Sequence, residues 1–161
     1  MNVVRFVLKR HEPRSLTPGV VRARKARDAL IEWRRGQGVD GELPKRADVG
    51  AFSTPRLARH LLVVDVVDNP FRFRVRLFGS DLVALLNQDW TGWMVDHRHL
   101  GPLGVHIASE MAATVGKRGP TAGANTVRRA DSPDVSYELV RVPLRGSGHS
   151  VAQIVACLEA T

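Results

Sequence analysis

Apolar and charged residues alternate most regularly between residues 71 and 77. Four apolar side chains are separated there by Arg72, Arg74 and Arg76, and a period of two places one side of a strand against a core and the other in water. A β-branched run, 61–67, precedes this segment, and Asp68-Asn69-Pro70 between them supplies turn chemistry. The pattern therefore predicts a β-hairpin.

Apolar spacing of three and four residues predicts helices before and after this hairpin. Over residues 17–35 the spacing indicates an amphipathic helix that begins at Thr17-Pro18 and ends at the glycines that follow. Residues 80–86 and 103–115 show the same helical period. Three more strands are expected at about 121–129, 135–144 and 150–159, with turns at 131–134 and 145–148.

Hairpins at both ends with helices between them indicate an α+β domain. We expect an antiparallel sheet with helices on one face, preceded by the amphipathic helix. The chain divides into a loose N-terminal arm (1–16), a basic helix and linker (17–56) and a folded domain (57–161).

The net charge of +8 lies entirely in the first third of the chain. Residues 1–60 carry 14 Lys and Arg against 6 Asp and Glu, whereas residues 61–161 carry 10 of each. A basic segment can bind nucleic acid, anionic lipid or an acidic protein, and it can also be a solvated helix face.

Several classes of protein are excluded by composition. The single cysteine, Cys157, cannot form an intrachain disulfide or a cysteine-rich zinc site. Charged residues interrupt the N-terminus before a signal peptide could form, and no run approaches the roughly 20 apolar residues that cross a bilayer. We therefore expect a cytoplasmic protein that does not insert into membranes.

Trp33 and five short motifs after it follow one another in a fixed order. Trp33 precedes the Leu-Pro-Lys-Arg-Ala-Asp segment 43–48, and the apolar strand 61–66 precedes the Phe-Arg-Val-Arg-Leu-Phe-Gly-Ser segment 73–80. The loop 87–92 and the Tyr-Glu…Pro-Leu strand 137–144 complete the series. In these motifs, over roughly residues 30–158, the chain resembles the PAS-domain superfamily, and more specifically a family of small stand-alone PAS-like proteins described mainly from alphaproteobacteria.

The resemblance implies a PAS-like five-stranded sheet with the strand order 2-1-5-4-3 and a sensory role, but fold alone names no ligand. Asn87 stands where the family has glycine, and asparagine tolerates the left-handed conformation. With no output domain in the chain, any signal is expected to pass to a separate signalling protein.

The sequence contains few residues or motifs that indicate an enzyme. We see neither a phosphate-binding glycine loop nor a nucleophile elbow, and we assign no catalytic residue. Asp96, His97 and His99 form the nearest approach to a metal cluster, but a third ligand would have to come from elsewhere, so we predict no metal. No cofactor is expected; haem held by His106, on the axial-ligand pattern of haem-binding relatives, is the alternative.

The leading hypothesis is a non-enzymatic sensory or regulatory module that acts as a homodimer through ligand- or partner-dependent interaction. A small apolar ligand would contact inward-facing residues, which could instead simply fill the core; the candidates are Phe73, Val75, Leu77, Trp93, His106, Met111 and Tyr137. The dimer interface is expected on the N-terminal helix, at Val20, Ala23, Leu30 and Trp33. The alternative is a basic interaction module that docks an acidic protein or, less favoured, nucleic acid.

Overall fold

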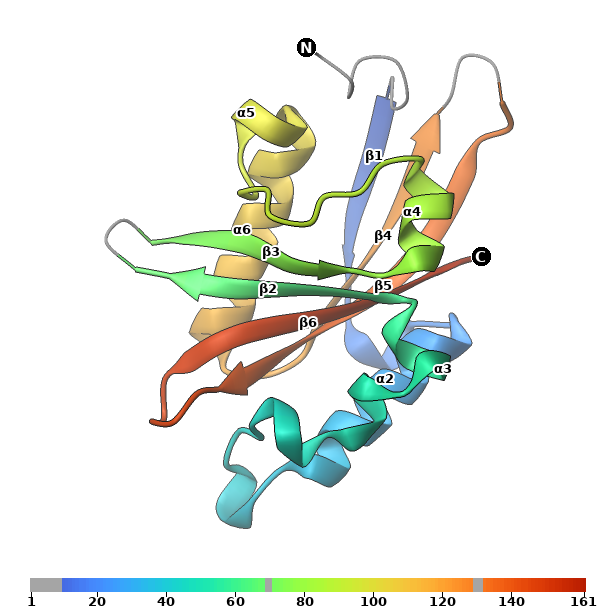
Figure 1. Ribbon diagram of the computed structural model, residues 1–161. Helices are drawn as coiled ribbons and strands as arrows, with labels where there is room; N and C mark the ends of the chain where they lie inside the picture. Colours follow the sequence, from blue (N-terminus) through green and yellow to red (C-terminus); the bar gives the residue numbers. More distant parts are fainter. Residues whose placement is uncertain (1–9, 69–70, 129–131) are drawn as a thin grey trace.

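A single antiparallel sheet organises the chain, whose computed structural model describes residues 10–68, 71–128 and 132–161 (Figure 1). Its strand order is β1-β4-β5-β6-β2-β3. The strands are β1 (Arg10–Leu16), β2 (Leu61–Val67), β3 (Arg72–Phe78), β4 (Thr121–Arg128), β5 (Val135–Arg145) and β6 (Val151–Ala160).

The five strands predicted from the sequence form the run β3-β2-β6-β5-β4, which is the expected order 2-1-5-4-3. A sixth strand, β1, extends the sheet by pairing with β4 from Arg10↔Arg128 to Leu16↔Ala122. The segment 10–16 is therefore an ordered edge strand and not part of a loose arm. Residues 1–9 of that arm, Asn69-Pro70 of the first predicted turn and Asp131 of the second lie outside the described residues.

The helices connect and cover the strands. They are α2 (Arg24–Gly36), α3 (Pro55–Ala58), α4 (Ser80–Leu86), α5 (His97–Leu100) and α6 (Pro102–Lys117), with 3-10 turns at Pro18–Val20, Val39–Gly41, Arg46–Asp48 and Gly50–Ser53. Asn87 ends α4 at a φ of 54°, the left-handed conformation expected for it. Within the described residues, no helix is long and apolar enough to span a membrane.

Helix α2 begins later than the sequence predicted. Thr17-Pro18 starts only a 3-10 turn, and Val21 returns to extended backbone before α2 begins at Arg24. The backbone N–H groups of Arg22 and Lys25 donate to carboxylates of the sheet, Glu138 at 2.7 Å and Glu159 at 3.0 Å. The bond from Lys25 satisfies a donor that the helix start leaves unpaired, and both bonds tie the start of α2 to the sheet.

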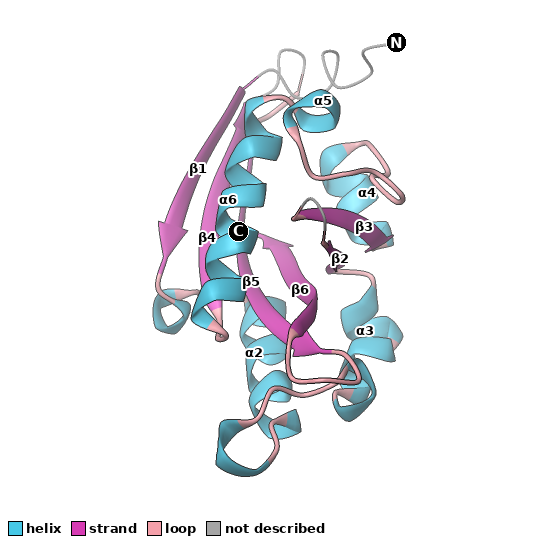
Figure 2. Cartoon of the chain, turned by 90° about the vertical axis from the view of Figure 1, so that its left-hand side faces the viewer, coloured by secondary structure: helices cyan, strands magenta, loops and turns pink. Residues whose placement is uncertain are grey.

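Helices cover both faces of the sheet, and α2 and α6 lie on opposite sides of β5 and β6 (Figures 1 and 2). Successive strand residues alternate between faces, and paired residues share one. The face under α2, here called the α2 face, carries Glu138, Val140, Val142, Val155, Cys157 and Glu159. The opposite face, here called the α6 face, carries Thr121, Asn125, Tyr137, Leu139, Arg141 and Leu158.

A bulge in the β2–β3 hairpin interrupts the alternation that defined β3 in the sequence. Val64 pairs with Val75, but the preceding Val63 pairs with Leu77, so Arg76 is the extra residue. Leu77 consequently turns to the α2 face. Phe78 takes the next place on the α6 face, where its ring stacks on Trp90 at a centroid distance of 4.8 Å.

Candidate functional site

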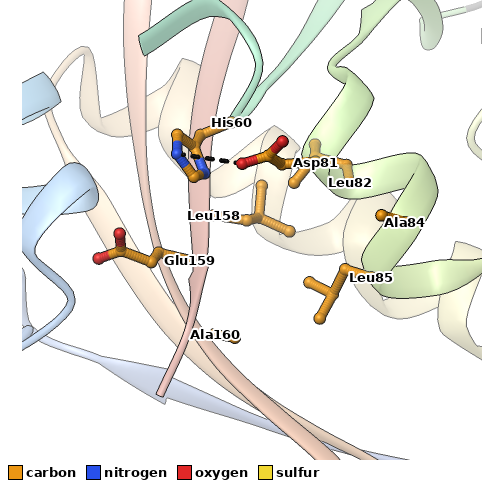
Figure 3. A pocket seen from close by; sticks show the side chains of 8 residues that line it. All are labelled: His60, Asp81, Leu82, Ala84, Leu85, Leu158, Glu159 and Ala160. Atoms are coloured by element: carbon orange, nitrogen blue, oxygen red, sulfur yellow. Dashed lines mark ion pairs between the residues drawn. The ribbon is translucent and has the colours of Figure 1, made fainter. Parts of the chain in front are cut away.

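A pocket of about 410 Å³ lies between α4 and the last residues of β6. This volume falls within the range typical of small-molecule sites. We call it the α4 pocket; it is lined by His60, Asp81, Leu82, Ala84, Leu85, Leu158, Glu159 and Ala160 (Figure 3).

The pocket exists because β2 is shorter than β6. The β2–β6 ladder starts at Leu61↔Cys157, and Leu158 N–H makes one further bond, to the carbonyl of His60 at 3.0 Å. On its other edge β6 still pairs with β5 as far as Ala160. The last residues of β6 therefore leave a gap beside β2 that a ligand can enter.

Helix α4 forms the opposite wall of this gap, and Gly79 allows it to approach. A Cβ at Gly79 would overlap the carbonyl of Arg59, so only glycine fits here. The backbone N–H of Asp81 donates to that same carbonyl at 3.0 Å. The junction between β3 and α4 is thus held against the residue before His60, which brings Asp81 to the pocket wall.

His60 supplies the unusual polar atom of the pocket. Its ring is largely buried, with 8% of the residue exposed, and Nε2 has no hydrogen-bond partner. Asp81 Oδ2 lies 3.4 Å away, at ion-pair distance for a protonated ring but without hydrogen-bond geometry. A buried polar atom without a hydrogen-bond partner lowers the stability of the fold. Nε2 is therefore suited to accept a hydrogen bond from a ligand or donate one to it.

The two carboxylates of the α4 pocket are already engaged elsewhere. Arg59 Nε lies 3.5 Å from Asp81 Oδ2 and offsets its charge. Glu159 accepts the bond from Lys25 N–H in the first turn of α2, and its side chain points away from α4 (Figure 3). What remains open to a ligand is mainly apolar, from Leu82, Leu85 and Leu158.

A second group of polar residues is buried beneath α6. Arg141, with 4% of its side chain exposed, reaches Glu110 of α6 at 3.4 Å and the Thr121 hydroxyl at 3.3 Å. Thr114 of α6 shares a 2.7 Å hydrogen bond with Thr121. Asn125 Nδ2 donates to the Tyr137 hydroxyl at 2.8 Å. The contacts of Glu110 and Thr114 therefore fix α6 on the sheet through polar groups.

Burial and hydrogen bonding shift the pKa values of several side chains. Desolvation raises the pKa of Tyr137, lowers the pKa of Arg141 and raises the pKa of Cys157 to about 12. For Asp65 burial alone would raise the pKa, but hydrogen bonds from Arg76 and Gln153 outweigh it and the pKa is lowered. Asp65 also forms a cross-strand ion pair with Arg76 at 2.8 Å.

The seven ligand candidates from the sequence lie apart from the α4 pocket. Phe73, Val75, Met111 and Tyr137 are buried in the core, Trp93 and His106 are half-buried, and Leu77 has turned to the α2 face. Trp93 faces His99, with ring centroids 5.8 Å apart. Their role in ligand binding stays a prediction.

The predicted interface residues are placed mainly inside the chain itself. Ala23, Leu30 and Trp33 are buried, and the Trp33 indole donates to the carbonyl of Pro143 at 2.8 Å. They therefore hold α2 to the sheet and are not available as docking anchors in this conformation. Only Val20 is exposed, at 57%.

Sequence reasoning missed His60 and Asp81 as site residues. Each stands at the end of a predicted strand: His60 directly before β2, and Asp81 two residues after Gly79, which follows β3. Because the two strands form an antiparallel hairpin, the start of one and the end of the other lie side by side. That relation was the signal available in the sequence.

Asp96 and His99 of the 96–99 segment have a structural role. Asp96 caps α5 by accepting from His99 N–H at 2.9 Å, and its carboxylate also contacts His99 Nδ1 at 2.8 Å. Among the residues that the structure describes, no group of three His, Cys, Asp or Glu side chains could hold a metal ion.

Comparison with known proteins adds similarity in shape only. Among solved structures, the chain is similar to the PAS domain of a Colwellia psychrerythraea protein (17% identity, TM-score 0.47, covering 63% of this chain and 84% of that one). It is also similar to the Rhodobacter sphaeroides LOV protein (11%, TM-score 0.47, covering 83% and 67%). No family model and no curated protein matches the chain.

The strand order 2-1-5-4-3, with α4 to α6 inserted between its second and third strands, decides the architecture. The chain has a PAS-like fold. Beyond that PAS-like core it carries β1 on the edge of β4, and α2 across the α2 face. Membership of the smaller alphaproteobacterial family stays a prediction.

Proposed function

We propose that this chain is a non-enzymatic sensory module that binds a small neutral molecule in the α4 pocket. The observation that carries the proposal is the buried, unpartnered Nε2 of His60 in the wall of a mainly apolar pocket of about 410 Å³. Ligand sites commonly combine an apolar lining with a few polar groups that orient the ligand.

The charges around the pocket favour a neutral ligand with one hydroxyl or amide group. The negative charge of Asp81 is offset by Arg59, so the pocket wall offers no unpaired charge to a charged ligand. A ligand hydroxyl beside both groups can donate its one proton to the Asp81 carboxylate and accept a hydrogen bond from Nε2–H of His60. The apolar body would then pack against Leu85 and Leu158.

Glu159 provides a physical route from the pocket to the surface of the molecule. It lines the α4 pocket and also accepts the hydrogen bond from Lys25 N–H at the start of α2. A ligand that shifts the end of β6 would change this bond, and with it the seating of α2. A partner protein that reads α2 would thereby receive the signal.

The shifted acids agree with a non-enzymatic role. The described carboxylates whose pKa departs from the usual value, Asp65, Asp89 and Asp96, are all lowered, so they are held ionised. General acids and bases have instead pKa values tuned toward neutrality.

A homodimer, also predicted from the sequence, would have to use exposed residues such as Val20 and Ile31 rather than Trp33.

The proposal is tested by native mass spectrometry of the purified protein beside its denatured mass. The variant Ala84→Trp places a large ring at the mouth of the α4 pocket, and Ala113→Trp makes the same change at an exposed position of α6. Added mass is expected on the wild type and Ala113→Trp but not on Ala84→Trp. Added mass that persists on Ala84→Trp places the ligand elsewhere, and a wild type without added mass contradicts a resident ligand.

A further inference from the structure

The outward side of α2 carries an unbalanced row of positive charge. The apolar side of this helix, with Ala26, Ala29, Leu30 and Trp33, is buried against β5 and β6. Taking 100° per residue, Arg24, Arg27, Ile31 and Arg34 lie next to one another on the solvent side, and all four are exposed. We call these four residues the basic flank.

The acidic residues of α2 do not neutralise this flank. Asp28 pairs with Arg56 at 2.9 Å, and Glu32 pairs with Arg35 at 3.0 Å. Asp28 and Glu32 lie on the other side of the exposed surface of α2, toward α3. Among the described residues, no ion pair involves Arg24, Arg27 or Arg34. Three solvated guanidinium groups are therefore free to meet an acidic partner.

An exposed aliphatic side chain stands among these arginines. Ile31 is 44% exposed, and Val20 just before the helix is 57% exposed. Phosphate groups would gain nothing from an isoleucine at the centre of their contact surface, because nucleic-acid interfaces are polar and positively charged. An amphipathic helix with acidic residues beside an apolar stripe complements both features, since apolar anchors give affinity and rim charges steer the encounter.

We propose that the basic flank of α2 docks an acidic amphipathic helix of a partner protein, with Ile31 as the apolar anchor. The flank runs from Arg24 to Arg34, over most of the 13 residues of α2, or about 16 Å of helix, which a partner helix of similar length can match. The planar guanidinium group of each arginine can form a bidentate pair of hydrogen bonds with a carboxylate. This docking requires no ligand in the α4 pocket, so it stands or falls apart from the sensory proposal.

The test measures fluorescence anisotropy of a labelled amphipathic peptide of about 18 residues, or five helical turns, with glutamates flanking a leucine stripe. The full chain is expected to bind it, more weakly at about 300 mM than at about 50 mM salt because screening increases. In Arg27→Glu/Arg34→Glu binding should weaken at least about tenfold, through lost pairs and new repulsion. Ile31→Ser should weaken binding without changing its salt dependence.

Two controls separate this surface from bulk charge and from nucleic-acid binding. The double variant Arg14→Glu/Arg72→Glu reverses two exposed arginines outside α2 and changes net charge by the same amount, so it should bind the peptide like the wild type. The proposal is overturned if the peptide does not bind at low salt, if both double variants weaken it equally, or if a single-stranded RNA of equal charge binds more tightly.

Discussion

The two faces of the sheet bury residues of different kinds. Under α2 the buried side chains are apolar, from Trp33 against β5 to Cys157 in β6, and the carboxylates of that face, Glu138 and Glu159, are only half-buried. Under α6 the sheet contributes Arg141, Asn125 and Tyr137, all less than 5% exposed. One face therefore resembles an ordinary apolar core, whereas the other contains a buried polar cluster.

This difference indicates what each face can do. Apolar packing stabilises without demanding one geometry, whereas a buried polar group stabilises only when its partners are in place. We therefore expect α2 to contribute most of the stability and the cluster beneath α6 to define one position for that helix. The α4 pocket lies beside both, at the end of β6 where Glu159 reaches α2.

Trp33→Ala should have the largest effect. It removes a buried ring and its 2.8 Å bond to Pro143, and such truncations cost about 3–5 kcal/mol. Ile31→Ala, on the exposed side of the same helix, should stay within about 0.5 kcal/mol. Denaturant unfolding measures both. Equal stability of the two variants would show that α2 is not packed as described.

The pair Glu110–Arg141 should show the opposite behaviour to an apolar contact. Glu110→Ala leaves Arg141 buried without its carboxylate and should cost about 1–3 kcal/mol, below a fully buried pair because Glu110 is partly solvated. Glu110→Leu combined with Arg141→Met should recover much of that loss. A double-mutant cycle gives the coupling, and simple additivity would contradict a specific polar contact.

Tyr137 should titrate only well above its ordinary range, because burial raises its pKa. The unfolded chain releases the phenolic proton first, so stability should fall as the pH rises above about 10. Tyr137 is the single tyrosine of the chain, and its phenolate absorbance can be followed directly. Tyr137→Phe should remove this part of the alkaline slope at a cost of about 1 kcal/mol at neutral pH; an unchanged slope would assign it to other groups.

Glu159→Gln should destabilise the chain only slightly, by about 0.5–1 kcal/mol, since it weakens one bond to the start of α2. Cys157 lies beneath α2 and its thiol pKa is about 12, so it should react with thiol reagents only when α2 opens. The labelling rate should rise about two- to fivefold in Glu159→Gln and remain unchanged in the control Glu32→Gln. Equal labelling rates in the wild type, Glu159→Gln and Glu32→Gln would contradict the role of Glu159 as the link between β6 and α2.

Much of the fold followed from the periods of two and three to four residues. Strands β2 to β6 and helices α4 and α6 lie within a few residues of their predicted bounds because each has a clear buried side. Strand β1 was missed because Pro13 interrupts its pattern. Proline is tolerated in edge strands, and β1 is one.

The candidate site could not be found in the same way. His60, Asp81 and Leu158 come from the ends of three different elements, and only the hairpin and the ladder of β6 bring them together. The local sequence pattern likewise did not predict the bulge that places Leu77 on the opposite face of the sheet from Val75. Trp33 and Leu30 were correctly identified as one apolar side of a helix, but the pattern does not tell a core from a partner surface.

The most direct test of the α4 pocket is a backbone amide titration by NMR with three probes of equal size, benzyl alcohol, benzoate and benzylamine. We predict saturable shifts at residues 82–85 and 158–160, strongest for the neutral alcohol, present in Ala113→Trp and lost in Ala84→Trp. Shifts that gather instead around Arg141 and Tyr137 beneath α6, or that survive in Ala84→Trp, would contradict the assignment of the α4 pocket as the ligand site.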